Sequence, residues 1–235
     1  MAQNQTNTLS NIKERENSIL KNVYLWMTVG LALTAIVAYG VASSHTLLRL
    51  FLGSGITFLF IVVAQFVVVF YLSSRLNTMS ANKAILSFAL YSVLTGITLS
   101  VVFYAYSGVV ISRAFFTTAA LFGGMSFYGM TTKRDLDGIG HYVIMALWGI
   151  IAASVINIFL KSEGFYFLIS IVGVIIFTLL TAWDTQKIKN LNASYGQSID
   201  EETYIKLSII GALMLYLDFI NIFLYLLRIF GRNRE

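Results

Sequence analysis

Seven long apolar stretches follow one another along this chain, separated by short polar segments. Each stretch is roughly 20 residues long, which is the length that an α-helix needs to cross the hydrocarbon core of a bilayer, about 30 Å. The predicted spans are residues 23–42, 55–72, 84–106, 110–130, 142–160, 165–183 and 205–230. The pattern predicts an all-α polytopic membrane protein with seven transmembrane helices in a lipid bilayer.

Polar residues flank the spans. Residues 1–22 are predicted to form a polar cytoplasmic leader, which is helical from Leu9 onward. This stretch is not read as a signal peptide, because it is too long and too mixed in charge for the first region of one. Residues 23–230 then form one seven-helix transmembrane domain, and residues 231–235 form a short basic tail. Ser198 and Glu201 have the spacing of a capping box, which predicts that the last helix begins before the membrane does.

The composition supports the membrane class. Hydrophobic residues make up 57% of the chain and charged residues 11%, against about 25% charged residues in soluble proteins. The formal net charge of +5 is explained by basic cytoplasmic loops, so we expect no nucleic-acid partner. The chain contains no cysteine, which excludes disulfides and thiolate zinc sites, and no proline, which excludes proline kinks.

The distribution of basic residues predicts the orientation. The leader and the loops on its side of the membrane hold ten lysines and arginines, whereas the loops on the other side hold three. Because cytoplasmic loops are enriched in basic residues, the N-terminus is predicted to be cytoplasmic. Seven spans would then place the C-terminus outside, although the tail carries Arg228, Arg232 and Arg234. A tail held at the interface, or a last helix that does not fully cross, would relieve this conflict.

The last span carries an acid, Asp218, near its middle. A carboxylate at the centre of a spanning helix costs roughly 2.5–3.5 kcal/mol on insertion scales, so it must face protein or water. Asp218 shares one helical stripe with small and polar residues, including Gly211 and Asn221. We therefore expect this helix to lie at the centre of the bundle, surrounded by the other six.

A second acid, Asp184, follows the sixth span. An acid at the end of a span is often interfacial and solvated. However, the sixth and seventh helices are consecutive and antiparallel, so Asp184 and Asp218 reach equal depth if the sixth helix continues past Asp184 before the chain turns back. A close pair of buried carboxylates cannot both ionise cheaply. Such a pair can hold one proton or a cation, which makes it a candidate pH sensor and cation site.

Three further polar residues are candidates for supporting roles. Arg75 follows the second span on the same predicted side as Asp184, so it could pair with the acids, or it could be an ordinary basic loop residue. Gln65 and Asn221 are candidate pore-facing residues, although a lone glutamine in a span more often forms a hydrogen bond between helices.

The sequence offers no residues for enzymatic chemistry. His45 and His141 fall on opposite predicted sides and are expected to be loop residues, and no catalytic triad, HExxH motif or phosphate-binding loop is present. Two acids make a poor calcium cage, which needs six to eight ligands, but a channel must bind its ion weakly. We expect no enzyme and no cofactor, with calcium only as a permeant ion.

Several stretches resemble the bacterial Bax inhibitor family, also called the transmembrane Bax-inhibitor-motif group. The resemblance rests on the region from Thr118 to Leu160 and on the motifs YLSSRLNTMS (71–80), WDTQKIK (183–189) and LYLDFINIFLYLLRIFG (215–231). It implies a seven-helix fold in which six helices surround the last one. It also implies a pH-sensitive calcium leak controlled by an aspartate pair, here Asp184 and Asp218, with Arg75 as the arginine that pairs with them.

Two other functions stay open beside a leak channel of the bacterial inner membrane. Some bacterial relatives are associated with membrane-bound proteases, so the protein could be a non-conducting regulator that binds and modulates such a protease through its leader and loops. A proton- or cation-coupled transporter could also use a carboxylate pair, although no inverted repeat is visible.

Overall fold

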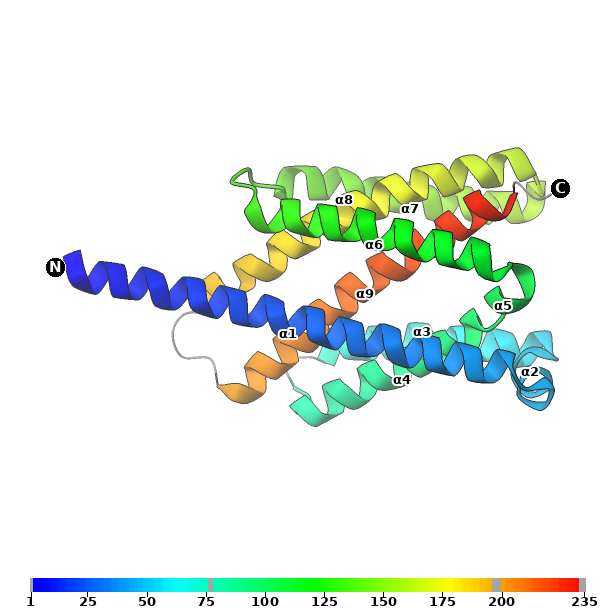
Figure 1. The fold of residues 1–235 in the computed structure, drawn as a ribbon, viewed down its shortest axis with the longest axis horizontal. Helices are drawn as coiled ribbons and strands as arrows, with labels where there is room; N and C mark the ends of the chain where they lie inside the picture. The colour runs from blue at the N-terminus through cyan, green and yellow to red at the C-terminus, as the bar shows by residue number, and fades with distance from the viewer. Residues whose placement is uncertain (1, 76–77, 196–199, 233–235) are drawn as a thin grey trace. The chain divides into compact units, whose positions relative to one another are not determined.

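The computed structural model describes residues 2–75, 78–195 and 200–232 (Figure 1). Within these ranges every regular element is a helix. The helices are α1 (Ala2–Ala42), α2 (His45–Leu52), α3 (Gly55–Arg75), α4 (Ala81–Leu99), α5 (Val102–Ala105), α6 (Gly108–Thr131), α7 (Asp137–Leu160), α8 (Glu163–Tyr195) and α9 (Glu201–Gly231).

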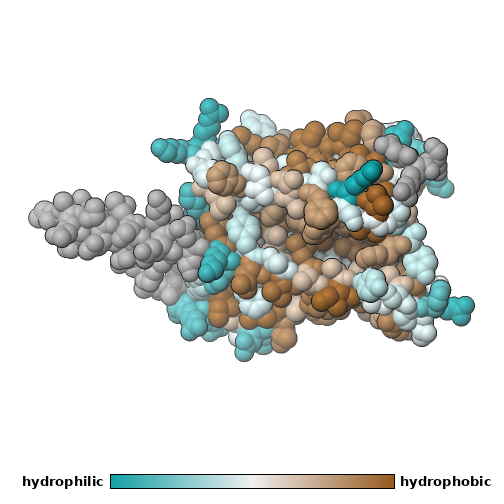
Figure 2. All heavy atoms as spheres, viewed as in Figure 1, coloured by the Kyte–Doolittle hydropathy of each residue, from teal (hydrophilic) through white to brown (hydrophobic). Residues whose placement is uncertain are grey.

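Seven helical segments in the described residues are long and apolar enough to cross a membrane, which confirms the predicted number of spans. They are Ile19–Ala42, Gly55–Arg75, Ala81–Ala105, Gly108–Thr131, Asp137–Leu160, Glu163–Leu191 and Glu201–Gly231. Large apolar side chains are exposed on these helices, among them Phe60 and Phe159, with 73% and 82% of their surface exposed. Figure 2 shows apolar side chains over much of the visible face of the helices. The chain is therefore an integral membrane protein.

Several helix boundaries can be compared with the sequence prediction. Helix α1 begins at Ala2 rather than at Leu9 and runs without a break into the first span. The third span is divided, because α4 ends at Leu99 and the short α5 follows. Helix α8 continues eleven residues beyond Asp184, to Tyr195. Helix α9 begins at Glu201, ahead of the predicted span, as expected.

The N-terminus of α9 is capped by Asp200, whose Oδ2 accepts a hydrogen bond from the Thr203 N–H at 3.3 Å. A hydrogen bond with the Thr203 side chain, together with this backbone bond, lowers the pKa of the exposed Asp200 carboxyl. The predicted capping residue, Ser198, lies outside the described residues.

Helix α2 was not predicted, because it is too short to appear as a separate apolar stretch. It begins after Ser44, whose hydroxyl accepts from the Leu47 N–H. One face of α2 packs Leu47, Leu48 and Phe51 against a small apolar core of α1, α3 and α4. The other face exposes polar side chains, so the helix is strongly amphipathic.

The chain divides into two compact units, which we describe separately. The first contains residues 1–105 and 189–216, and the second contains residues 106–188 and 217–235. Helices α8 and α9 therefore each contribute residues to both units.

In the first unit, α4 packs against both α1 and α3 (Figure 1). Helices α1 and α4 approach closely at Gly96, where an added Cβ would lie 2.7 Å from Cβ of Val37. The aromatic rings of Phe88 and Tyr91, both on α4, pack edge-on against Tyr216 of α9.

In the second unit, the side chain of Gln186 on α8 holds the connection between α6 and α7. Its Oε1 accepts from the Leu136 N–H and its Nε2 donates to the Arg134 carbonyl, both at 2.8 Å. Trp183 packs over Gly140 at the start of α7, where an added Cβ would collide with the indole. The Trp183 N–H also donates to the Asp137 carboxylate at 2.9 Å. This end of α8 is therefore held in place by several contacts.

Helix α9 is the most buried of the candidate spans. In the most apolar 18-residue stretch of α9, 67% is buried inside the protein, whereas the corresponding share is 11–44% in the other six spans. This burial agrees with a helix that faces protein on most sides, as Asp218 requires. The central position of α9 among the six other helices stays a prediction.

Candidate functional site

Asp218 lies on α9 in the second unit and is almost fully buried, with 3% of its surface exposed. Thr181 of α8 hydrogen-bonds to its carboxylate. One carboxylate oxygen, Oδ2, is buried without a hydrogen-bond partner. An unsatisfied buried carboxylate oxygen is costly and uncommon in proteins, so it marks Asp218 as a candidate functional group.

Asp184 lies on α8 in the same unit and is also buried, with 8% of its surface exposed. The interfacial, solvated position that is common for an acid at the end of a span is therefore wrong here. The physical reason is that α8 continues past Asp184, so the acid lies within the helix and not at its end.

The structure brings the two acids together. Asp184 and Asp218 are close enough for their charges to interact, as expected for consecutive antiparallel helices. No third acid or histidine joins them, because the described residues contain no cluster of three or more such side chains that could hold a metal. The pair can therefore share a proton or attract a cation, but it cannot enclose an ion by itself.

Two neighbours of the pair on α8 were not singled out from the sequence. Thr181 and Lys187 lie three residues before and after Asp184, so helical spacing places both on its side of the helix. Thr181 binds Asp218. The Lys187 ammonium lies 5.1 Å from the centre of the Trp183 ring, where its positive charge also attracts the Asp184 carboxylate. The i±3 spacing could have identified both residues.

The other predicted site residues lie on α3 and α9. Arg75 is the last residue of α3, in the first unit, and its side chain is exposed. Gln65 donates to the Leu94 carbonyl at 2.9 Å and to the Thr98 hydroxyl at 3.0 Å, which agrees with a hydrogen bond between helices α3 and α4. Asn221 donates to the Leu217 carbonyl within α9. The latch role of Arg75 and the pore-facing roles of Gln65 and Asn221 stay predictions.

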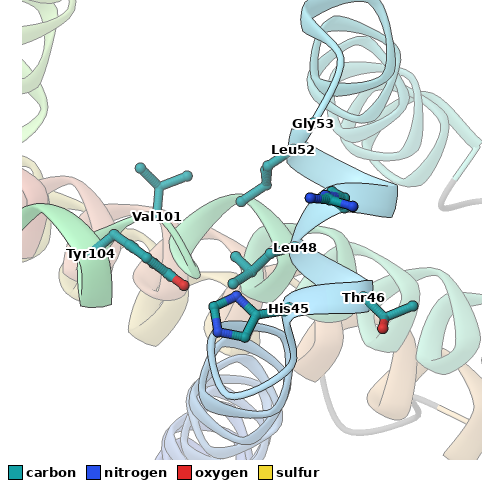
Figure 3. Close-up of a pocket in the computed structure, with 8 residues that line it drawn as sticks. His45, Thr46, Leu48, Leu52, Gly53, Val101 and Tyr104 are labelled. Atoms are coloured by element: carbon teal, nitrogen blue, oxygen red, sulfur yellow. The ribbon is translucent and has the colours of Figure 1, made fainter.

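Both histidines lie in helices, so their assignment to loops was wrong. His141 is an exposed residue in the first turns of α7, which begins five residues earlier than predicted. His45 is the first residue of α2. It lines a cavity of about 850 Å³ in the first unit, together with Arg49 and Tyr104 (Figure 3). This cavity contains neither acid of the pair.

Comparison with known proteins identifies the family. The sequence model described as "Inhibitor of apoptosis-promoting Bax1" matches residues 16–235. The chain belongs to the Bax inhibitor-1 family. Family relatives include the inner membrane protein YbhL of Escherichia coli, which is 47% identical over 218 residues, covering 92% of each chain. A protein of Borreliella burgdorferi is 43% identical over 94% of each chain, and a membrane protein of Streptococcus pyogenes is 36% identical over 92% of this chain and 93% of its own.

Proposed function

We propose that this Bax inhibitor-1 family member is a pH-sensitive calcium leak of the bacterial inner membrane, with its N-terminus in the cytoplasm. The observation that carries the proposal is the interaction of two buried acids, Asp184 and Asp218, on consecutive helices of an integral membrane protein. Burying such a pair is costly in a protein interior, so a functional role is the simplest reason for its presence. The inner-membrane location is supported by the relative YbhL, which is an inner membrane protein.

The pair acts as both sensor and cation site. When both carboxylates are ionised, their charges attract a divalent cation. When they hold a proton, that attraction falls and the ion is released. Arg75 serves as a latch if it reaches the ionised pair in one state of the protein. The protein needs no cofactor and performs no enzymatic step, and calcium is only the permeant ion.

Thr181 supports the proposal because its hydrogen bonding with Asp218 depends on whether Asp218 is protonated. Its hydroxyl lies 2.8 Å from the Phe177 carbonyl as well as within hydrogen-bonding reach of Asp218. One hydroxyl proton cannot satisfy both acceptors fully. When Asp218 is protonated, it can donate to Thr181 while Thr181 donates to Phe177. When Asp218 is ionised, the Thr181 hydroxyl has to divide between the two acceptors. Protonation therefore changes the link between α8 and α9.

The decisive experiment measures calcium influx into liposomes that contain the purified protein, from pH 5 to pH 8. We expect a flux that depends on pH and that loses this dependence in Asp218→Asn and in Asp184→Asn. Glu201→Gln is the matched control, because Glu201 is an exposed acid at the start of the same helix as Asp218. A flux with unchanged pH dependence in both pair variants would refute the proposed mechanism.

A second candidate function is a non-conducting regulator of a membrane-bound protease. It is favoured by one observation: α1 begins at Ala2, well before its membrane-spanning part begins at Ile19. A helix that extends beyond the membrane can serve as a binding element for a partner. Deleting residues 2–18 should abolish such regulation while leaving calcium flux intact. If liposomes show no flux above background at any pH, this function replaces the leak.

A further inference from the structure

A second cavity lies in the second unit, at the end of the membrane spans where α8 begins and α9 ends. It has a volume of about 430 Å³, and neither Asp184 nor Asp218 lines it. Its main lining residues are aromatic or charged: Tyr106, Glu163, Tyr166, Phe167, Arg228 and Arg232. Aromatic and basic side chains together are typical of the zone where a membrane protein meets lipid headgroups.

Aromatic rings position both arginines of this cavity. The Arg228 guanidinium lies 4.8 Å from the centre of the Tyr166 ring and 5.4 Å from that of Tyr225. The Arg232 guanidinium lies 4.6 Å from the centre of the Phe167 ring. A guanidinium stacked on a ring keeps its N–H donors free at its edge, and that edge can bind a phosphate with two parallel hydrogen bonds.

The positive charge of the cavity is available to a ligand. Glu163 also lines the cavity, but within the described part of the chain it forms no ion pair with either arginine. Two arginines and one glutamate leave a net charge of about +1 in the cavity. The site is therefore complementary to an anion.

Tyr106 adds a neutral donor. Its ring packs against Gly231, where an added Cβ would collide with it. Burial is the main cause that raises the pKa of Tyr106, and the neighbouring Tyr166 raises it further. Arg228 lowers it, but by less. The hydroxyl consequently keeps its proton at neutral pH and can donate a hydrogen bond to a phosphate oxygen.

Helix α8 also has an exposed apolar face, which lies around the helix from the residues that line the cavity. Leu168, Val172 and Ile175 are exposed by 53%, 39% and 54%, and their spacing places them on one face of the helix. They begin five residues after Glu163, the first residue of α8. The cavity itself lies at the end of the membrane spans, where lipid headgroups are found, so a molecule with an anionic head and long apolar chains fits its position.

We propose that this cavity binds the phosphate of an anionic phospholipid through Arg228, Arg232 and Tyr106, with the acyl chains extending into the surrounding membrane. The predicted orientation places this end of the protein outside the cytoplasm, where basic residues are disfavoured. A bound lipid phosphate provides an anionic partner, which these arginines lack within the described residues. The proposal is independent of the acid pair and of calcium flux.

The test measures binding of phosphatidylglycerol and phosphatidylcholine to the full-length protein in detergent, by native mass spectrometry and by the lipid-induced shift in Tm. We expect phosphatidylglycerol to bind more tightly and to raise Tm more. In Arg228→Gln/Arg232→Gln, the apparent affinity for phosphatidylglycerol should fall by about tenfold or more, because two charge-assisted contacts are lost. Affinity for phosphatidylcholine should stay the same.

Three controls make the result specific. Arg113→Gln removes one positive charge from the same unit, near the start of α6 and outside this cavity, so it should keep the preference for phosphatidylglycerol. Arg232→Gln alone provides a variant with little risk of misfolding, since Arg232 is exposed, and should lose part of the affinity. Arg228→Lys/Arg232→Lys preserves the charge but loses the planar guanidinium, so it should also bind more weakly.

Each contrary outcome overturns the proposal. Equal loss in Arg113→Gln would show that general surface charge attracts the lipid. Full binding by the double lysine variant would exclude recognition by the stacked guanidinium groups. If glycerol 3-phosphate, a soluble anion, raised Tm as much as phosphatidylglycerol, the cavity would be a site for soluble phosphates and not for lipid.

Discussion

Helix α9 carries two buried polar side chains that differ in how completely they are satisfied. Tyr216 has no exposed surface, and its hydroxyl lies 2.7 Å from that of Thr34. Because Thr34 already donates its proton to the Ser92 carbonyl at 3.0 Å, Tyr216 must be the donor to Thr34. Asp218 is buried almost as deeply, yet its Oδ2 has no hydrogen-bond partner.

The difference separates a structural group from a functional one. A satisfied buried network such as Tyr216–Thr34–Ser92 specifies one packing arrangement and has nothing left to bind. An unsatisfied carboxylate next to a second acid lowers stability but keeps the capacity to bind a proton or a cation. We therefore expect changes at Tyr216 to act on folding and changes at Asp218 to act on transport.

The largest effect on stability is expected from Tyr216→Ala. The substitution leaves a cavity beside Phe88 and Tyr91 and should lower the free energy of unfolding by about 3 kcal/mol or more. Thermal or denaturant unfolding in detergent micelles would measure the loss. Tyr104→Ala is the control, because 63% of Tyr104 is exposed, and it should cost far less.

Tyr216→Phe isolates the hydroxyl of the same side chain. The ring contacts remain and one buried hydrogen bond is lost, so we expect a decrease of about 1 kcal/mol in the free energy of unfolding. The same unfolding assay applies. A loss as large as that of Tyr216→Ala would show that the hydroxyl network, and not ring packing, dominates this region.

Asp200, directly before α9, is a third polar group for comparison. It is an exposed acid, and its carboxylate accepts a hydrogen bond from the Thr203 N–H. Asp200→Ala should lower Tm slightly at pH 7, since it removes the cap of α9. The pKa of Asp200 is lower in the folded state, so its contribution is fully present above its ordinary pKa of about 3.9 and is lost as the pH falls through the folded value. The Tm difference between variant and parent should vanish in strong acid. A difference that persisted there would mean that the carboxylate is not the source of the stabilisation.

The smallest loss of stability is expected from Asp218→Asn, despite the depth of its burial. The substitution replaces an ionisable group by a neutral one of the same shape, so the free energy of unfolding should stay within about 1 kcal/mol of the parent value or rise. The unfolding assay should be run on the preparation used for calcium flux. A loss of about 3 kcal/mol would remove the contrast with Tyr216 and would make Asp218 a structural group.

Much of the fold was predictable because the bilayer imposes a fixed length on each span. The seven spans followed from hydropathy alone, with most boundaries within a few residues of the structure, although α8 continues well beyond the predicted end of the sixth span. Helix α2 was missed because eight residues form too short an apolar segment to detect. The division between α4 and α5 was also missed, since the apolar pattern continues through Ser100 and Val101.

The candidate site was predictable in part. Asp218 was recognisable because a charge within an apolar span is costly, and Asp184 because consecutive antiparallel helices bring their neighbouring ends together. Thr181 and Lys187 were missed, although their spacing from Asp184 was visible. The relation of Arg75 to the pair could not be derived, because no local pattern specifies which distant helix its side chain meets.

The sequence by itself determined the membrane class, the number of spans and the identity of the two acids, because hydropathy and the cost of a buried charge are local properties of the chain. Only the tertiary structure decided that α8 continues past Asp184, that both acids are buried and interact, and that Oδ2 of Asp218 has no partner. Only packing also showed that Tyr216 is satisfied by Thr34, a residue of α1. Burial and hydrogen-bond satisfaction depend on neighbours that are remote in the chain, so no local pattern specifies them.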